Sequence, residues 1–292
     1  MKLTAVRDCE MEQNAPNVLT LRFKNIRAGW QQWLLLSSDR HHDSVDTDNT
    51  LEKKHLDMAA ERSAIILDFG DMHDVMQGTN DKRGSRDKIK AGLGEVAYFD
   101  AVIHQAVDFY GPYADLLALV GKGNHETSVA KYYGKDLTDR FAAEMRDRRK
   151  GITISGGYGG WVRMQFVVGT AHRESLNLSY HHGSGDSPQM SFGTLNIRRQ
   201  ASFMPTADVV VNGHTHDQYI VPLKRLQLSD KGVPYQDIQW HVRTPSYKDE
   251  YKAAEAGWTV EKGKGPKPIG CVWGRLFYED GHVRCEFTAD LK

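Results

Sequence analysis

Residues 117–126 read Leu-Ala-Leu-Val-Gly-Lys-Gly-Asn-His-Glu. The four apolar residues at the start of this stretch predict a short buried strand. The glycines that follow allow a sharp turn and a close approach of the backbone to another group. Asn124 and His125 then stand at the strand end, where an open α/β sheet holds its ligands. The stretch therefore predicts an α/β fold with polar chemistry at the carboxyl ends of its strands.

Four further apolar runs, at residues 33–36, 64–69, 176–180 and 207–211, end in the same way. The polar groups that follow them are, in order, Asp39-Arg40-His41, Gly70-Asp71-Met72-His73-Asp74, His181-His182-Gly183 and Gly213-His214-Thr215-His216. Strand ends on one side of a sheet lie close together, however far apart they are in sequence. We therefore expect these groups to meet with Asn124 at one site.

Seven of these side chains carry donors typical of metal ligands: Asp39, His41, Asp71, Asn124, His182, His214 and His216. Any one of them alone is weak evidence, because an isolated histidine is more often structural. Carboxylate, imidazole and amide donors suit Mn, Fe, Zn, Ni or Co. Seven ligands are more than one tetrahedral ion needs. They fit two divalent metal ions, with manganese as first choice, about 3.5–4 Å apart and sharing a bridging carboxylate.

Together the five motifs resemble those of the calcineurin-like metallophosphoesterases, over residues 33–220. The resemblance implies a two-sheet β-sandwich flanked by helices, with the metal site at the carboxyl ends of the strands. It also implies that Asp71 bridges the two metals. The remaining ligands would divide into Asp39, His41 and His216 for one metal, and Asn124, His182 and His214 for the other.

The resemblance further implies that His125 is the catalytic histidine and that Asp74 is the carboxylate that orients it. Elementary chemistry supports these roles. Two cations lower the pKa of a shared water towards neutrality and neutralise phosphoryl oxygens as charge builds up. The leaving alkoxide needs a proton, which a histidine beside Asn124 can supply. A neighbouring carboxylate would fix the tautomer of that histidine.

Three histidines next to these motifs are not assigned as ligands. His181 and His182 are adjacent, so their side chains point in opposite directions along a strand. The family pattern places the ligand directly before glycine, which selects His182. His42 and His73 flank ligands and are assigned structural or substrate-lining roles.

The choice of phosphoester follows from what the motifs lack. The protein serine/threonine phosphatases carry an arginine after the second motif, where this chain has Val75-Met76-Gln77. Lys122 stands where those enzymes have another arginine, although a lysine can still contact a phosphate as a point charge. We therefore expect a phosphodiesterase acting on nucleotides or nucleic-acid ends. A phosphomonoesterase and a non-catalytic scaffold of the same fold are the alternatives.

The composition is that of an ordinary globular protein. The 292 residues are 40% hydrophobic and 26% charged, and 38 Lys and Arg balance 38 Asp and Glu. This balance argues against a protein that coats long duplex nucleic acid. We read residues 1–292 as a single domain, in which residues 221–292 complete the sandwich.

No membrane partner or export is expected. The three cysteines, Cys9, Cys271 and Cys285, are too few and too widely spaced for a zinc pair, so we expect reduced thiols. The first residues lack the apolar core of a signal peptide. No apolar run approaches the roughly 20 residues of a membrane helix. These features predict a cytoplasmic protein.

Local patterns also predict several elements. Apolar spacing predicts helices over residues 50–62 and 93–110, the second stopped by Gly111-Pro112, and a third helix near 137–145 capped by Asp136 or Thr138. A hairpin is expected about Asp280-Gly281, and one or two edge strands within residues 1–30. Residues 78–88 and 244–268 are expected to be loops. The basic residues of the first loop would be solvated, with a phosphate contact as the alternative.

Overall fold

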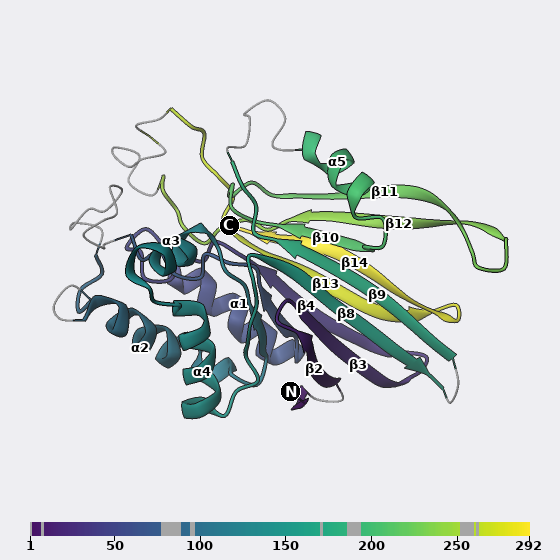
Figure 1. Ribbon diagram of the computed structural model, residues 1–292, viewed down its shortest axis with the longest axis horizontal. Helices are drawn as coiled ribbons and strands as arrows, with labels where there is room; N and C mark the ends of the chain where they lie inside the picture. Colours follow the sequence, from purple (N-terminus) through teal and green to yellow (C-terminus); the bar gives the residue numbers. More distant parts are fainter. Residues whose placement is uncertain are drawn as a thin grey trace.

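The computed structural model describes residues 2–6, 9–76, 89–93, 97–169, 172–185, 194–251, 260 and 263–292. Two β-sheets share one hydrophobic core, to which Leu21 and Phe166 of one sheet and Leu35 and Ile66 of the other belong. Helices gather mainly at one end of the sheets (Figure 1). This arrangement confirms the predicted α/β class and the two-sheet sandwich flanked by helices.

The six-stranded sheet carries three of the five motifs. Its strand order is β14 (His282–Leu291), β13 (Gly270–Glu279), β4 (Gln31–Ser37), β5 (Ile65–Asp68), β6 (Leu117–Val120) and β7 (Ile154–Ser155). The four strands from β4 to β7 are parallel. Every residue of β5 and β6 is buried, which explains why these strands are unbroken apolar runs in the sequence. Because the strands are parallel, the loops after β4, β5 and β6 emerge at the same edge.

The eight-stranded sheet supplies the other two motifs. Its order is β1 (Lys2–Val6), β2 (Cys9–Ala15), β3 (Val18–Ile26), β8 (Gly159–Val168), β9 (His172–His181), β10 (Val209–Asn212), β12 (Pro234–Arg243) and β11 (Tyr219–Leu228). Strands β9 and β10 are parallel and end side by side, where Asn212 is opposite His181. The prediction of one or two edge strands near the N-terminus is confirmed only in part, because β1 is an edge strand of this sheet. That region forms three strands, and β3 is an interior strand because it pairs with β8.

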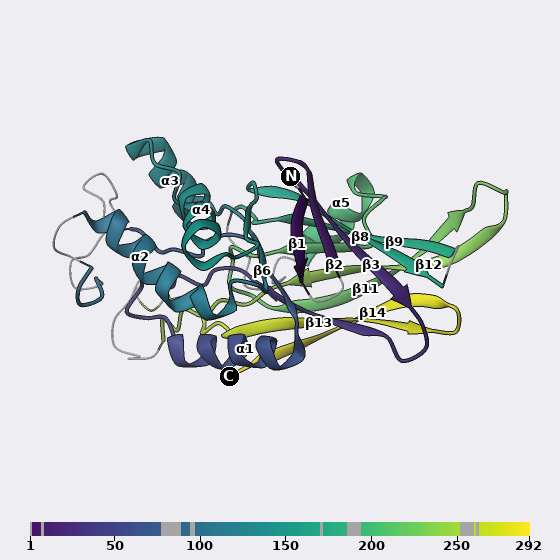
Figure 2. The ribbon, with the colours of Figure 1, turned by 90° about the horizontal axis from the view of Figure 1, so that it is seen from below.

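Helices α1 to α4 pack near the six-stranded sheet. Helix α1 (Asn49–Arg62) contacts β4 and β13, and α4 (Leu137–Arg149) contacts β7 and α2 (Tyr98–Tyr110). Figure 2 shows α1 on the other side of this region from α2, α3 (Asn124–Tyr133) and α4. Helix α5 (Leu195–Phe203) lies apart from them, beside β11 and β12 (Figure 1). Helices α3 and α5 were not predicted.

The predicted helix ends are partly confirmed. Helix α2 ends at Tyr110 and is followed by the short 3-10 helix Gly111–Tyr113, as the Gly-Pro pair indicates. It begins at Tyr98 rather than residue 93, because Ala97 adopts a left-handed conformation with φ of 57° that interrupts a helix. Asp136 caps α4, since its side chain accepts a hydrogen bond from the amide of Asp139 at 3.0 Å.

The C-terminal hairpin is confirmed. Strands β13 and β14 pair from Gly270 to Leu291, and the turn residues Asp280 and Gly281 both have positive φ, 50° and 86°. This is the conformation that a two-residue type I′ turn requires. Strand β13 also pairs with β4, so the end of the chain completes the six-stranded sheet.

The predicted loops lie largely outside the described residues: this applies to residues 78–88, to residues 252–259 and to 261–262. Within the described part of 244–268, Thr47 pairs with Lys248 and Ser246 pairs with Ile269 in isolated bridges. All three cysteines are free thiols. Among the described helices, none combines the length and the apolar character that crossing a bilayer requires.

Candidate metal centre

The loops after β4 and β5 run alongside each other and fix the first candidate ligands. The amide of Asp39 donates to the carbonyl of Gly70 at 2.8 Å, and that of His41 donates to the carbonyl of Asp71 at 3.0 Å. Gly70 has φ of 108°, and a side chain there would lie 2.6 Å from the backbone of Lys122. The three parallel strands therefore deliver their motifs to one place through backbone contacts between the loops.

Five of the seven candidate ligands adopt left-handed backbone conformations. They are Asp39, His41, Asp71, His214 and His216, with φ between 45° and 73°. This conformation is unfavourable for residues other than glycine, by about 1–3 kcal/mol each, and persists where the surrounding structure imposes it. Its concentration on these residues indicates a functional site.

The candidate ligands form two adjoining groups. In the first, Nε2 of His216 lies 3.3 Å from Nε2 of His41 and 3.5 Å from Oδ1 of Asp39. In the second, Nε2 of His182 lies 3.1 Å from Oδ2 of Asp71 and 3.3 Å from Oδ1 of Asn124. His214 belongs to this second group with Asp71 and His182. All seven predicted ligands are thus brought together in the structure.

Asp39 approaches both groups. Its Oδ1 lies 3.5 Å from Nε2 of His216 and 3.9 Å from Nε2 of His182. The same oxygen is buried without a hydrogen-bond partner, whereas Oδ2 accepts the amide of His214 at 2.8 Å. An unpaired buried carboxylate oxygen among imidazoles is what a cation site requires. The residues therefore fit a divalent metal. The bridging role of Asp71 stays a prediction, because Asp71 is grouped only with His182 and His214.

The titration of these groups reflects the pairing of carboxylates with imidazoles. Burial alone would raise the pKa of Asp39, but the neighbouring imidazoles of His182 and His216 hold it below its ordinary value. Burial opposes protonation of His182, yet the carboxylates of Asp71 and Asp39 raise the pKa of its imidazole to about 10. The protein thus favours a positive charge at this position.

Two glycines of the motifs make this closeness possible. A Cβ atom on Gly123 would lie 1.9 Å from Oδ1 of Asp71, and one on Gly213 would lie 2.1 Å from Oγ of Ser38 and 2.6 Å from Oδ2 of Asp39. Neither glycine has positive φ, so space rather than backbone conformation requires glycine here. Both glycines allow the loops to come into contact with the candidate carboxylates.

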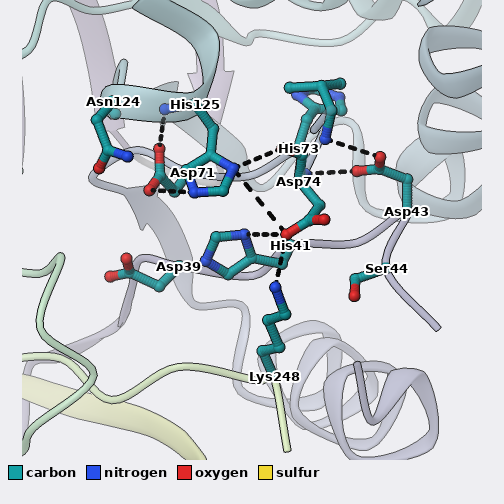
Figure 3. Close-up of polar contacts among 12 residues, drawn as sticks. Asp39, His41, Asp43, Ser44, Asp71, His73, Asp74, Asn124, His125 and Lys248 are labelled. Atoms are coloured by element: carbon teal, nitrogen blue, oxygen red, sulfur yellow. Dashed lines mark hydrogen bonds and ion pairs between the residues drawn. The ribbon is translucent and has the colours of Figure 1, made fainter. Parts of the chain in front are cut away.

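The ring of His125 contacts Asp74 (Figure 3). Its Nδ1 donates to the main-chain carbonyl of Asp74 at 2.5 Å, whereas the Asp74 carboxylate is 4.0 Å away. That carboxylate lies 3.0 Å from Nδ1 of His41 and 2.9 Å from Nζ of Lys248. The carbonyl contact leaves Nε2 of His125 directed towards Oδ2 of Asp71, at 3.8 Å. The backbone carbonyl of Asp74 is therefore the nearer partner of the ring, and the orienting role of its carboxylate stays a prediction.

The flanking histidines lie outside the two ligand groups. His42 places Nδ1 3.0 Å from Glu52, and Nδ1 of His181 accepts the amide of Gly183 at 3.0 Å. His73 is buried with its Nδ1 3.6 Å from Glu126. Lys122, the alternative phosphate contact, forms an ion pair with Asp136.

Two residues that shape the site were missed in the sequence. Glu126, in the first turn of α3, accepts hydrogen bonds from the amides of Asp71, His73 and Gly123 at 2.9–3.1 Å. A capping-box pattern, with Glu three residues after Gly123, could have predicted part of this role. Lys248, which contacts Asp74, gave no local signal.

No family model matches the chain, and no curated protein sequence matches it. Solved structures do match. One is an uncharacterised Streptococcus pneumoniae TIGR4 protein described as a predicted phosphoesterase, at 12% identity and TM-score 0.33, covering 90% of this chain and 91% of that one. Vacuolar Protein Sorting 29 from Cryptosporidium parvum matches at 10% identity and TM-score 0.37, covering 90% and 100%. GAP50, the anchor in the inner membrane complex of Plasmodium, matches at 12% identity and TM-score 0.46, covering 89% and 84%.

Proposed function

We propose that the protein is a metal-dependent phosphoester hydrolase with a preference for phosphodiesters, such as nucleotides or nucleic-acid ends. The observation that supports this most strongly is the convergence of seven ligand-type side chains from five strand ends into two adjoining groups. We further propose that the enzyme uses two divalent ions, with manganese first, and works in the cytoplasm.

Each group has a part in the proposed reaction. Asp39, His41 and His216 would hold one cation, and Asp71, Asn124, His182 and His214 the other, with Asp71 shared. When bound, the cations supply a water of lowered pKa and neutralise charge on the phosphoryl oxygens. His125 donates its Nδ1 proton to the Asp74 carbonyl, so Nε2 is the atom that can carry a proton to the leaving oxygen.

The preference for diesters rests on the arrangement of the cationic side chains. Arg40, the arginine of the first motif, is fully buried and paired with Glu52 and Asp68, so it cannot reach a substrate. Lys122 is paired with Asp136, and Lys248 with Asp74. A dianionic monoester would need more unpaired positive charge than a monoanionic diester. Among the residues that the structure describes, which do not include Lys82, Arg83, Arg86 and Lys88, the pairing of these three cations favours the diester.

Model substrates test this proposal. We expect manganese-loaded wild-type protein to hydrolyse bis-p-nitrophenyl phosphate faster than p-nitrophenyl phosphate. His125→Ala should reduce kcat at least a hundredfold with metal binding retained, whereas Asp71→Asn should weaken both metal binding and activity. His104→Ala, at an exposed position on α2, is the matched control and should behave as wild type.

Each alternative gives its own result. Much faster turnover of the monoester would favour a phosphatase. Hydrolysis of neither substrate by protein that holds two metal ions would leave the scaffold as the function.

A further inference from the structure

A second group of ligand-type side chains lies at the other end of the sheets. His172 begins β9, and His282 begins β14. Strand β9 ends at His181, next to His182 of the candidate metal centre, so at about 3.3 Å per residue the two places are roughly 30 Å apart. The group is therefore separate from the candidate metal centre. In Figure 1 it belongs to the end of the molecule that carries the β13–β14 turn, away from helices α1 to α4.

Two imidazoles converge on one carboxylate in this group. Nε2 of His172 lies 2.8 Å from Oε1 of Glu174, and Nδ1 of His282 lies 3.0 Å from the same oxygen. The three ligand atoms are all within 4.8 Å of one another. Zinc bonds of about 2.0–2.2 Å to His and Glu need ligand atoms roughly 3.3 Å apart in a tetrahedral site. The two distances to Oε1 of Glu174 are already close to this spacing, and rotation of the two exposed imidazoles can adjust the separation between their nitrogen atoms.

The carboxylate is held in place by a separate contact. Oε2 of Glu174 accepts the amide of Val283 at 2.7 Å. Strand β14 is an edge of its sheet, so no strand of the described part of the chain pairs with its outer side. His172 and Glu174 are two residues apart on β9 and therefore face the same way. A ligand that is fixed by an outer hydrogen bond in this manner is typical of metal sites.

The two ligand strands belong to different sheets. Strand β9 lies in the eight-stranded sheet and β14 in the six-stranded one. The side chains of His172 and His282 are 54% and 70% exposed, whereas that of Glu174 is 17% exposed. An ion there would have three protein ligands and would keep water in its open position.

We propose that His172, Glu174 and His282 bind one divalent transition-metal ion of the zinc type, which fastens the two sheets together at this end. Two imidazoles and a carboxylate form a donor set that favours zinc, nickel or copper over magnesium or calcium. The ion stabilises the folded chain, because it binds ligands that only the packed sheets bring together. This site is independent of the proposed hydrolase activity.

Zinc titration of metal-free protein tests the proposal. Wild type and the double variant His172→Gln/His282→Gln are compared by calorimetry and by metal analysis after gel filtration. We expect the wild type to bind one zinc ion more per chain than the variant, whatever number the candidate centre holds. Zinc should also raise the melting temperature of the wild type more than that of the variant. His104→Gln, which replaces an exposed histidine that also faces a glutamate, is the matched control and should keep the extra ion.

Two results would overturn the proposal. One is an equal number of bound zinc ions in the wild type and the double variant. The other is a melting temperature that differs between them as much in EDTA as in zinc, which would make the group a hydrogen-bonded contact between the sheets. Because both histidines are exposed, the variants should fold. Manganese-dependent hydrolysis should be the same in the double variant as in the wild type. An absence of hydrolysis in the wild type would therefore count against the proposed function and not against this zinc site.

Discussion

Nζ of Lys248 lies 2.9 Å from Oδ1 of Asp74, and both side chains are buried. The same Asp74 oxygen lies 3.0 Å from Nδ1 of His41. Burial alone would raise the pKa of Asp74, but the Lys248 ammonium and the His41 imidazole hold it far below its ordinary value. A charged carboxylate thus lies beside Nδ1 of His41, while Nε2 of the same ring is directed towards His216. We therefore infer that Lys248 positions the candidate ligand His41 through Asp74.

Replacing this lysine should weaken metal binding. In Lys248→Met the buried carboxylate loses its counter-ion and attracts a proton to His41, which competes with a cation. We expect the dissociation constant for manganese to rise at least tenfold, since loss of an outer partner of a metal ligand has effects of about 10–100-fold. Titration calorimetry measures this dissociation constant. Lys53→Met, which removes an exposed lysine paired with Asp57, is the control. Equal affinities of Lys248→Met and wild type would show that Lys248 has no positioning role.

The glycines of the motifs offer a test of close packing. In Gly123→Ala the new methyl group would lie 1.9 Å from Oδ1 of Asp71, so either the carboxylate or the start of α3 must move. We expect hydrolysis to fall at least a hundredfold, because a displacement of about 1 Å in a catalytic site has that effect. Gly265→Ala has open space around its Cβ position and should keep full activity. Normal activity in Gly123→Ala would mean that Asp71 is not needed at its present position.

The candidate ligands could be predicted because each motif is local. Consecutive residues form a buried strand, a turn and a polar side chain, and parallel strands bring their ends together. The contact between Lys248 and Asp74 could not be predicted, because the two residues are 174 positions apart. The orientation of His125 could not be predicted either, since it depends on whether a backbone or a side-chain oxygen of Asp74 faces the ring. Helix α3 could not be predicted because its start coincides with the Asn-His pair, whose residue types indicate a site more strongly than a helix.

Arg40, which lies between the candidate ligands Asp39 and His41 in the sequence, balances buried negative charge. Its fully buried guanidinium donates to Glu52 at 3.0 Å and to Asp68 at 2.8 Å, and lies over the rings of Tyr110 and Tyr247. Arg40→Met leaves two buried carboxylates without their cation. We expect a loss of about 3–5 kcal/mol in the free energy of unfolding, measured in urea.

A compensated variant separates charge from packing at this position. Adding Glu52→Gln and Asp68→Asn to Arg40→Met removes the unpaired charges, so part of the lost stability should return. Arg275→Met, which removes a half-exposed arginine paired with Glu286, should change stability by about 0.5 kcal/mol or less. A single variant Arg40→Met as stable as wild type would contradict the view that this arginine balances buried charge.

Acid should destabilise the fold through His241 on β12. This side chain is 1% exposed, and its Nε2 lies 3.0 Å from Oε1 of Gln239. Burial, assisted by the nearby charge of Arg225, lowers the pKa of His241 to about 4. The unfolded chain takes up this proton near pH 6.5, before the folded chain does, so stability present above pH 6.5 is lost as the pH falls towards 4.

His241→Gln removes the titrating group. Between pH 7 and pH 5, the free energy of unfolding of this variant should therefore fall by about 2 kcal/mol less than that of the wild type. Urea unfolding of both proteins from pH 7.5 to 4.5 measures this difference, with His104→Gln, at an exposed site, expected to follow the wild-type curve. Parallel curves for wild type and His241→Gln would show that burial of this imidazole does not govern the acid sensitivity of the protein.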